Sequence, residues 1–210
     1  HLLISDSRNQ VRRPRDAYSF LPTLGEADLY LFGKGDERRI YEKLGAQLRT
    51  IDGVHGTSFA VWAPNARRVS VVGDFNHWDK HAHVLKARED GSGIWEGFIP
   101  ELGYGTLYKY HIRSHNRHEA EKGDPFAFFW ETPPRTASVV WDLDYHWEDG
   151  AWMKDRHSRN GLGSPISVYE LHLGSWRRVP DEGNRSLTYR ELASFLPDYL
   201  KDSGFTHVEF

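Results

Sequence analysis

The stretch TSFAVWAPNARRVSVVGDFNHW, residues 57–78, decides the fold of the larger part of this chain. It holds two runs rich in valine and aromatic residues, at 58–62 and 68–73, with a turn-forming segment between them. Such runs are typical of β-strands, whereas Pro, Asn, Asp and Gly mark turns. The stretch therefore predicts two strands joined by a short connection, with a tight turn at Gly73–Asn76.

The same pattern continues to residue 145. Further strand-like runs occur at 93–100, 107–113 and 136–143, each bounded by turn residues. In the second of these runs the side chains alternate, so Tyr108 and Tyr110 lie on one face and Lys109 on the other. Several short strands at near-regular spacing predict a mainly β protein, with an immunoglobulin-like antiparallel β-sandwich over residues 53–145.

The segments that flank this sandwich have other patterns. Residues 1–13 predict a strand, a turn at 6–9 and a second strand. We interpret residues 1–52 as the remnant of an upstream β domain plus a connecting segment, which includes a short helix at 25–35. The stretch 146–163 is charged and contains glycine, and we interpret it as a linker.

The last part of the chain changes from the period of a strand to that of a helix. A strand candidate at 166–173 is followed by the capping box Thr188-x-x-Glu191, an apolar helical face and a second strand candidate at 206–210. This order predicts a βαβ unit with a parallel strand pair. Two strands and one helix cannot bury their apolar faces alone, so we expect residues 164–210 to begin a larger α/β domain that is incomplete here.

Composition excludes several classes of function. The 210 residues include no cysteine, so disulfides and cysteine nucleophiles are excluded. A formal net charge of −3 lacks the excess of positive charge that is typical of nucleic-acid-binding proteins. The mean hydropathy of −0.66 and the lack of a long apolar run exclude a membrane span. The missing cysteines, together with the lack of a signal-peptide pattern, favour a cytoplasmic protein.

Two groups of motifs point to a family. Phe59–Ala66 and Val69–Asp79 resemble the starch- and glycogen-binding module that precedes the catalytic barrel in the α-amylase superfamily. Tyr169–Arg178, Ser186–Ala193 and Gly204–Glu209 resemble the first barrel strand and the segments after it in bacterial 1,4-α-glucan (glycogen) branching enzymes. The HLGSWRR motif in the first of these segments favours branching enzymes over other relatives that carry the module.

The resemblance implies a β-sandwich carbohydrate-binding module followed by the first βαβ unit of a truncated (β/α)8 TIM barrel. It implies a transferase of glycogen biosynthesis, which cuts an α-1,4 glucan and transfers the piece to a 6-hydroxyl to form an α-1,6 branch. The superfamily uses two carboxylic acids in a retaining mechanism. Those acids belong to later barrel strands, so no catalytic residue is expected in this chain, and the chain alone is expected to be inactive.

The same resemblance sets the expected partners. These are α-glucans, namely glycogen, amylose and maltooligosaccharides, whereas no cofactor, metal, nucleic acid or membrane is expected. Two alternatives remain open. One is a stand-alone glucan-binding module, which would have no use for a capped helix between two parallel strands. The other is part of a debranching or trehalose-releasing relative, which the module alone also fits.

Three residues are candidates for glucan binding, two of them in or just after the Gly73–Asn76 turn and the third in the strand-like run at 107–113. Trp78 follows the turn, where an indole ring would be partly exposed and could stack on the C–H face of a sugar. Lys109 lies between two tyrosines and can donate to sugar hydroxyls, and Asn76 offers a planar amide. The alternatives are a core tryptophan and an ordinary surface lysine. Related modules often carry a second tryptophan on the turn after the lysine strand, and its absence from 114–118 predicts weak binding.

The other tryptophans are expected to serve packing. Those within alternating strands are expected in the core, and those near the end of the sandwich are expected to pack the module against the barrel. The first group is Trp62 and Trp95, and the second is Trp130, Trp141, Trp147 and Trp152.

A second candidate site follows the first barrel strand. Active sites of such barrels lie at the C-terminal ends of the strands. His172, Ser175 and Trp176 are therefore candidates for lining a glucan cleft, with structural support as the alternative. The histidines at 77, 81 and 83 lie around a polar turn without the support that a metal site needs, so no metal site is predicted there.

Overall fold

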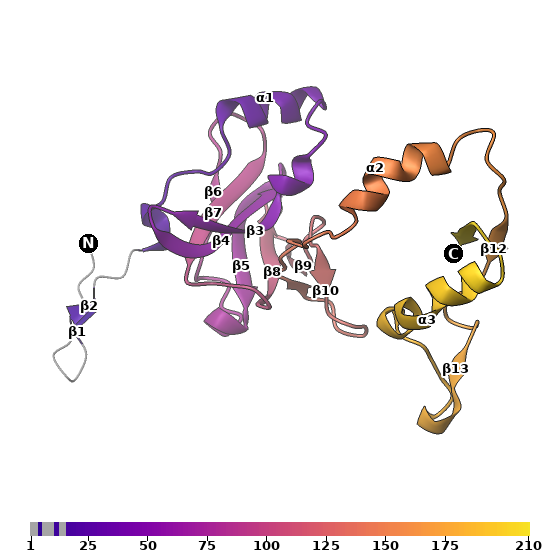
Figure 1. Cartoon of the computed structure of the whole chain (residues 1–210). Helices are drawn as coiled ribbons and strands as arrows, with labels where there is room; N and C mark the ends of the chain where they lie inside the picture. Colours follow the sequence, from indigo (N-terminus) through magenta and orange to yellow (C-terminus); the bar gives the residue numbers. More distant parts are fainter. Residues whose placement is uncertain (1–3, 6–10, 13–15) are drawn as a thin grey trace. The chain divides into compact units, whose positions relative to one another are not determined.

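Figure 1 shows the computed structural model of the chain, which describes residues 4–5, 11–12 and 16–210. The chain divides into two compact units between Asp144 and Tyr145. Near the start, β1 (Ile4–Ser5) and β2 (Val11–Arg12) pair antiparallel, as in the hairpin predicted from the sequence. The predicted turn between them, at 6–9, lies outside the described residues.

One sheet of the first unit has four antiparallel strands in the order β3-β4-β7-β6. Asp52 and Gly53 form the turn between β3 and β4 with positive φ angles of 50° and 77°, a geometry that matches the twist of a hairpin. The sheet thus begins at Gly45, ahead of the start at residue 53 expected from the sequence. The strand bounds are β3 (Gly45–Ile51), β4 (Val54–Trp62), β6 (Lys86–Ala87) and β7 (Ile94–Pro100).

The other sheet of the first unit has the order β10-β11-β8-β5, with β9 paired to β8 as well. Every pairing in this sheet is antiparallel. The prediction of a mainly β protein with antiparallel sheets is therefore confirmed. The strand bounds are β5 (Ala66–Gly73), β8 (Leu107–Ser114), β9 (Glu119–Lys122), β10 (Phe129–Trp130) and β11 (Ser138–Val139).

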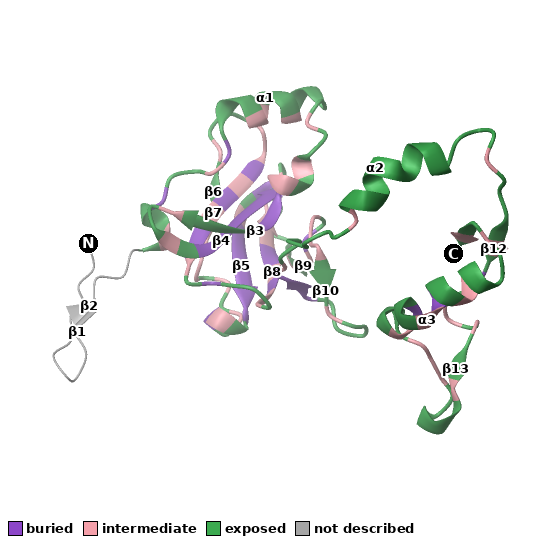
Figure 2. Ribbon diagram, in the orientation of Figure 1, coloured by how far each residue is buried: buried purple, intermediate pink, exposed green. Residues whose placement is uncertain are grey.

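The main core of the first unit is built from residues of both sheets, and Figure 2 shows most of β4 and β5 as buried. The predicted alternation in β8 is confirmed, because Tyr108 and Tyr110 are fully buried whereas Lys109 is only half-buried. Aromatic rings meet edge-on in this core, which suits their quadrupoles. Its buried members include Phe59 and Val61 of β4, Val69 and Val71 of β5, and Tyr108 and Tyr110 of β8.

A buried carboxylate fixes the inward direction of the two tyrosines. Oδ2 of Asp124 accepts hydrogen bonds from the hydroxyl groups of Tyr108 at 2.6 Å and Tyr110 at 3.1 Å. Its Oδ1 accepts from the backbone N–H of Phe126 at 2.8 Å. Burial raises the pKa of Asp124, because the charged form loses its hydration. Since the neighbouring tyrosines are held on the inner face, Lys109 projects from the opposite face of β8.

A third layer covers the outer face of the β3-β4-β7-β6 sheet. It consists of η1 (Ala17–Ser19), α1 (Glu26–Lys34), η2 (Ile40–Glu42) and their connections. α1 ends as its sequence predicts, at Gly35 with a left-handed φ of 74°. The buried residues beneath this layer are Leu24, Leu44, Ala60 and Ile94.

Glu96 of β7 attaches this layer to the sheet. The residue is only 3% exposed, and its Oε2 accepts hydrogen bonds from the backbone N–H groups of Thr23 at 2.8 Å and Leu24 at 3.2 Å. Its Oε1 accepts from Nη1 of Arg88 at 3.1 Å. The buried charge is therefore paired and fully hydrogen-bonded, which is the condition for keeping it inside.

The two tryptophans expected in the core, Trp62 and Trp95, differ in burial. Trp95 is half-buried, packs against the main core and donates from Nε1 to the carbonyl of Ala63, so that prediction is confirmed. The prediction for Trp62 is wrong, since its side chain is 55% exposed. Trp62 is the last residue of β4, where Phe32 of the covering layer meets its ring edge-on but leaves more than half of the side chain exposed.

The second unit contains the predicted βαβ arrangement. β12 (Val168–Glu170) and β15 (His207–Glu209) pair in parallel, and α3 (Tyr189–Asp202) connects them. The capping box is confirmed, because the Thr188 side chain accepts from the N–H of Glu191 and the Glu191 carboxylate accepts from the N–H of Thr188. A short hairpin that the sequence did not indicate precedes the helix, formed by β13 (Arg178–Val179), η4 (Pro180–Glu182) and β14 (Arg185–Ser186).

The segment interpreted as a linker forms α2 (Gly150–Arg159). None of its residues is buried, and its last turn carries Arg156, His157 and Arg159. Cationic side chains at a helix C-terminus interact favourably with the helix dipole. Among the described residues, no helix has both the length and the apolar character that crossing a bilayer requires.

Candidate functional site

The turn that carries Trp78 is shaped by close backbone contacts. It begins at Gly73, where an added Cβ would lie 2.1 Å from the carbonyl oxygen of Leu107 in β8. η3 (Asp74–Asn76) follows, and the N–H of Trp78 then donates back to the carbonyl of Gly73 at 2.9 Å. Trp78 itself has a left-handed φ of 58°, which a bulky residue rarely adopts. The surrounding contacts thus hold the tryptophan in a conformation that it would otherwise avoid.

Asn76 holds this turn from the inside. Its Oδ1 accepts from the N–H of Gly73 at 3.0 Å, and its Nδ2 donates to the carbonyl of Val71 at 2.9 Å and meets Nδ1 of His83 at 3.1 Å. The residue is only 8% exposed. Its amide is therefore hydrogen-bonded within the protein, where it supports the turn, and the glucan contact expected of Asn76 stays a prediction.

The other two predicted residues meet on the surface. Trp78 is half-buried, and its Nε1 donates to Oδ1 of Asp74 at 2.8 Å, which fixes the orientation of the indole. Nζ of Lys109 lies 5.9 Å from the centroid of the Trp78 ring. The pairing of β5 with β8, with Val72 opposite Lys109, brings them together. The fold thus places an oriented aromatic ring beside a flexible ammonium donor. We call this pair the Trp78–Lys109 site.

No tryptophan stands on the turn after β8, and polar groups shape that turn. The N–H of Ser114 donates to the carbonyl of His118 at 2.9 Å, and Oδ1 of Asn116 accepts from the N–H of His118 at 3.2 Å. The side chains of residues 115–118 are exposed and polar. The weak binding expected from the missing second tryptophan stays a prediction.

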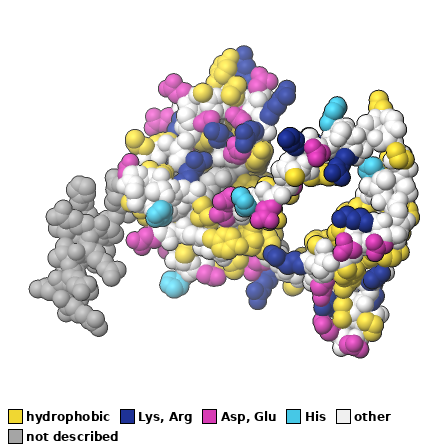
Figure 3. All heavy atoms as spheres, in the orientation of Figure 1, with side chains coloured by type: hydrophobic (Ala, Val, Ile, Leu, Met, Phe, Trp, Pro, Cys, Tyr) yellow, Lys and Arg dark blue, Asp and Glu magenta, His cyan; other side chains and the backbone are white. Residues whose placement is uncertain are grey.

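A separate group of aromatic side chains reaches the surface of the first unit. The rings of Phe129 and Trp141 are stacked, with centroids 4.2 Å apart, and Tyr104 lies 4.6 Å from the same indole. Phe129 is 45% exposed and Tyr104 57%. Figure 3 shows hydrophobic side chains at the surface of this unit. The sequence indicated Trp141 as a packing residue, but Tyr104 carried no signal, because it lies in a turn.

The second candidate site lies just beyond β12. Nδ1 of His172 is 3.0 Å from Oγ of Ser175, and both residues are exposed. Trp176 is half-buried, donates from Nε1 to the hydroxyl of Tyr169 at 3.0 Å and stacks on Phe195 of α3. The structure thus brings His172 and Ser175 together, whereas the contacts of Trp176 favour the alternative of structural support.

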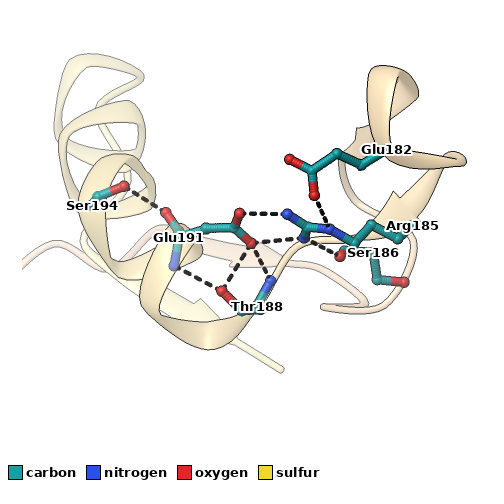
Figure 4. A network of polar contacts seen from close by, with 6 residues as sticks. All are labelled: Glu182, Arg185, Ser186, Thr188, Glu191 and Ser194. Carbon is teal, nitrogen blue, oxygen red and sulfur yellow. Dashed lines mark hydrogen bonds and ion pairs between the residues drawn. The ribbon is translucent and has the colours of Figure 1, made fainter.

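A polar network, drawn in Figure 4, connects the β13–β14 hairpin to the first turn of α3. Arg185 contacts Glu182 from Nε at 2.7 Å and both carboxylate oxygens of Glu191, at 2.8 and 3.0 Å. These hydrogen bonds lower the pKa of Glu191 to about 2, with Arg185 as the largest cause. The capping box was evident from the sequence, but Arg185 was not, since its contacts depend on the hairpin.

The described residues contain no cluster of three or more His, Cys, Asp or Glu side chains that could hold a metal ion. Near the Trp78 turn, Nδ1 of His81 lies 3.3 Å from Nη1 of Arg68, while His83 faces Asn76. These two histidines therefore point to different partners. The arrangement can orient an aromatic ring and offer hydrogen bonds, which is the chemistry of a binding site.

Comparison with protein families defines the first unit. Residues 43–127 match carbohydrate-binding module 48, described as the isoamylase N-terminal domain. This span contains both members of the Trp78–Lys109 site and most strands of the two sheets. The larger part of the first unit is thus similar to carbohydrate-binding module 48.

The homologues of the chain are 1,4-α-glucan branching enzymes, as the sequence motifs indicated. It is 57% identical over 198 residues to the 1,4-alpha-glucan branching enzyme GlgB of Myxococcus xanthus (strain DK1622), covering 93% of this chain and 27% of that protein. It is 54% identical over 187 residues to the GlgB of Aquifex aeolicus (strain VF5), covering 89% of this chain and 30% of that protein. The chain thus spans less than a third of the length of these relatives.

Solved structures share the fold. The structure of Klebsiella pneumoniae pullulanase complexed with maltotriose matches with a TM-score of 0.54 and 26% sequence identity. The match covers 79% of this chain and 17% of that chain.

Proposed function

We propose that this chain is part of a 1,4-α-glucan branching enzyme, and that its first unit holds α-glucan at the Trp78–Lys109 site. Such an enzyme cleaves an α-1,4 glucan and joins the cut piece to a 6-hydroxyl as an α-1,6 branch. The proposal is supported by relatives at 54–57% identity over most of the chain and by the module family of residues 43–127. The substrates would be glycogen, amylose and maltooligosaccharides, and a cytoplasmic location stays a prediction.

The observation that carries the binding role is the oriented indole beside Lys109. A glucose ring presents an apolar C–H face, which an aromatic ring can cover, and hydroxyl groups at its rim, which need donors and acceptors. The hydrogen bond from Nε1 to Asp74 fixes the Trp78 ring before any sugar arrives. A preorganised contact loses less entropy on binding. Lys109 adds three rotatable donors within reach of a sugar on that ring.

We further propose that β12, α3 and β15 are the first βαβ unit of a (β/α)8 barrel. The parallel pairing of β12 with β15 supports this assignment. His172 and Ser175 lie just after the C-terminal end of β12, the end at which barrel active sites are built. They would line the glucan cleft, with Trp176, which stacks on Phe195 of α3, as structural support. The catalytic carboxylates would come from barrel strands outside this chain.

Binding is tested by electrophoresis in native gels with and without glycogen. The chain should be retarded by glycogen, and Trp78→Ala should remove most of the retardation. Trp62→Ala is the matched control, because the Trp62 side chain reaches the surface and its indole N–H is bonded to the carbonyl of Ser92, but Trp62 belongs to β4, in a different sheet from Lys109. If Trp78→Ala migrates like the parent chain, the glucan platform lies elsewhere.

The catalytic part of the proposal needs an activity measurement. The full-length enzyme incubated with amylose should create new α-1,6 linkages, detected after debranching, whereas this chain alone should create none. Branching by the chain alone would contradict the assignment of the catalytic acids to other strands. Release of trehalose or hydrolysis of existing branches by the full-length enzyme would instead favour the alternative relatives.

A further inference from the structure

His83 supports the Trp78 turn through Asn76. Its Nδ1 lies 3.1 Å from Nδ2 of Asn76, and its carbonyl accepts from the N–H of Val71 at 3.1 Å. The imidazole also packs edge-on against Phe75, with ring centroids 5.3 Å apart. His83 thus contacts the turn in three ways, through its backbone carbonyl, through its ring nitrogen Nδ1 and through the face-to-edge packing of its ring on Phe75.

The hydrogen-bond pattern of Asn76 specifies the protonation state of His83. The N–H of Gly73 can only donate, so the Asn76 atom that meets it is the carboxamide oxygen. The two hydrogens of Nδ2 are then directed to the carbonyl of Val71 and to Nδ1 of His83. Nδ1 must accept, and an imidazolium ion has no acceptor. If the Asn76 amide rotated by half a turn, its oxygen could accept from a protonated His83. Its Nδ2 would then face the N–H of Gly73, and two donors would meet.

The surroundings of His83 keep the ring neutral at physiological pH. Burial lowers the pKa of His83, because the charged form loses hydration, although the charges of Asp16 and Asp79 oppose this effect. Asp16 caps η1, and Asp79 follows Trp78. His83 also borders a cavity of about 370 Å³. The other charged or titratable groups that line this cavity are Tyr18, Lys86, Arg88, Glu89, Asp90 and Glu96.

We propose that His83 is a positioning residue for the Trp78–Lys109 site, and that protonation of its ring loosens the turn and weakens glucan binding in mildly acidic solution. The binding part of this inference rests on the proposed function. The direction of this pH dependence follows from the acceptor role of Nδ1. Neutral histidine completes the Asn76 network, so the site is intact above the pKa of His83, which lies below the usual value of about 6.5, and is loosened as the pH falls through it.

The first test needs no glucan. Nuclear magnetic resonance of the whole chain would follow the indole N–H of Trp78, identified by its loss in Trp78→Phe, between about pH 8 and pH 5. This N–H is bonded to Asp74 within the turn, so its resonance reports the geometry of the turn. It should shift with the same midpoint as the ring of His83. A Trp78 resonance that stays constant while His83 titrates would overturn the proposal.

The second test measures the affinity for maltoheptaose by calorimetry over the same pH range. Loss of one neutral hydrogen bond should weaken binding about three- to tenfold at the acidic end. His83→Asn places a carboxamide oxygen near the position of Nδ1, so it should bind like the parent chain at high pH and lose the pH dependence. His83→Leu should bind weakly at every pH. His81→Asn, the control, should keep the pH dependence of the parent chain.

The two tests separate this inference from the proposed function. If the chain binds no maltoheptaose at any pH, the proposed binding role fails, and the resonance of Trp78 still decides whether His83 controls the turn. If His83→Asn binds with the same pH dependence as the parent chain, the histidine does not act as proposed.

Discussion

Replacement of Asp124 by alanine is expected to destabilise the first unit strongly. Asp124 is completely buried, and three donors point at its carboxylate: the hydroxyl groups of Tyr108 and Tyr110 and the N–H of Phe126. Asp124→Ala leaves all three without their acceptor in a closed core. Each buried polar group without a partner costs about 1–3 kcal/mol. Removal of the buried carboxylate itself offsets part of this cost, so we expect a net loss of about 3–5 kcal/mol.

Urea denaturation followed by tryptophan fluorescence measures this loss. The denaturant slope should stay constant while the midpoint falls, since the same surface is exposed on unfolding. Asp124→Asn is the matched control, because its amide can still accept at one atom and can donate to the tyrosine oxygens, so its loss should be clearly smaller. A loss below about 1 kcal/mol for Asp124→Ala would refute the view that this network holds β8 in place.

The same residue predicts a pH dependence. Burial raises the pKa of Asp124, so over some pH range the folded chain retains a proton that the unfolded chain has released. Stability then falls as the pH rises from the unfolded value, about 3.9, through the raised value. Asp124→Asn should flatten this fall. If the parent chain and Asp124→Asn show parallel stability curves in acid, the pKa of Asp124 is the same in the folded and unfolded chains, and the expected effect of burial is absent.

Three further changes have outcomes set by the structure. Gly73→Ala brings a Cβ to 2.1 Å from the carbonyl of Leu107, so it should displace the Trp78 turn and reduce glycogen retardation in native gels. Glu96→Ala removes the acceptor for Thr23 and Leu24, so the hydrogen exchange of these amides should accelerate more than that of amides in the sandwich core. Thr188→Ala should destabilise the second unit by about 1 kcal/mol in thermal unfolding, through loss of the helix cap.

Local patterns predicted much of this fold. The alternation around Lys109 gave the inner and outer faces of β8, because a strand places successive side chains on opposite faces. The Thr188–Glu191 capping box gave the start of α3, because both of its hydrogen bonds are local. The proximity of Trp78 and Lys109 was not predicted from the sequence, because it depends on the pairing of β5 with β8.

Other features depended on the folded chain and carried no clear pattern in the sequence. Asn76 carries a side chain suited to sugars, but its partners on Val71 and His83 become visible only in the folded turn. Trp62 lies in a strand with a buried pattern, yet it is the last residue of that strand and its side chain is exposed. The charged segment 146–163 offered no apolar face, and so it did not indicate α2.

The layer over the β3-β4-β7-β6 sheet has a consequence for anyone who wants this module as a portable affinity tag. The family match begins at residue 43, which invites excision at that point. Such a cut would remove Leu24 and the helix α1, and it would strip the cover from Leu44, Ala60 and Ile94. Buried apolar residues exposed in this way promote aggregation. A usable tag must therefore begin upstream of η1, so that it includes the covering layer as well as the two sheets.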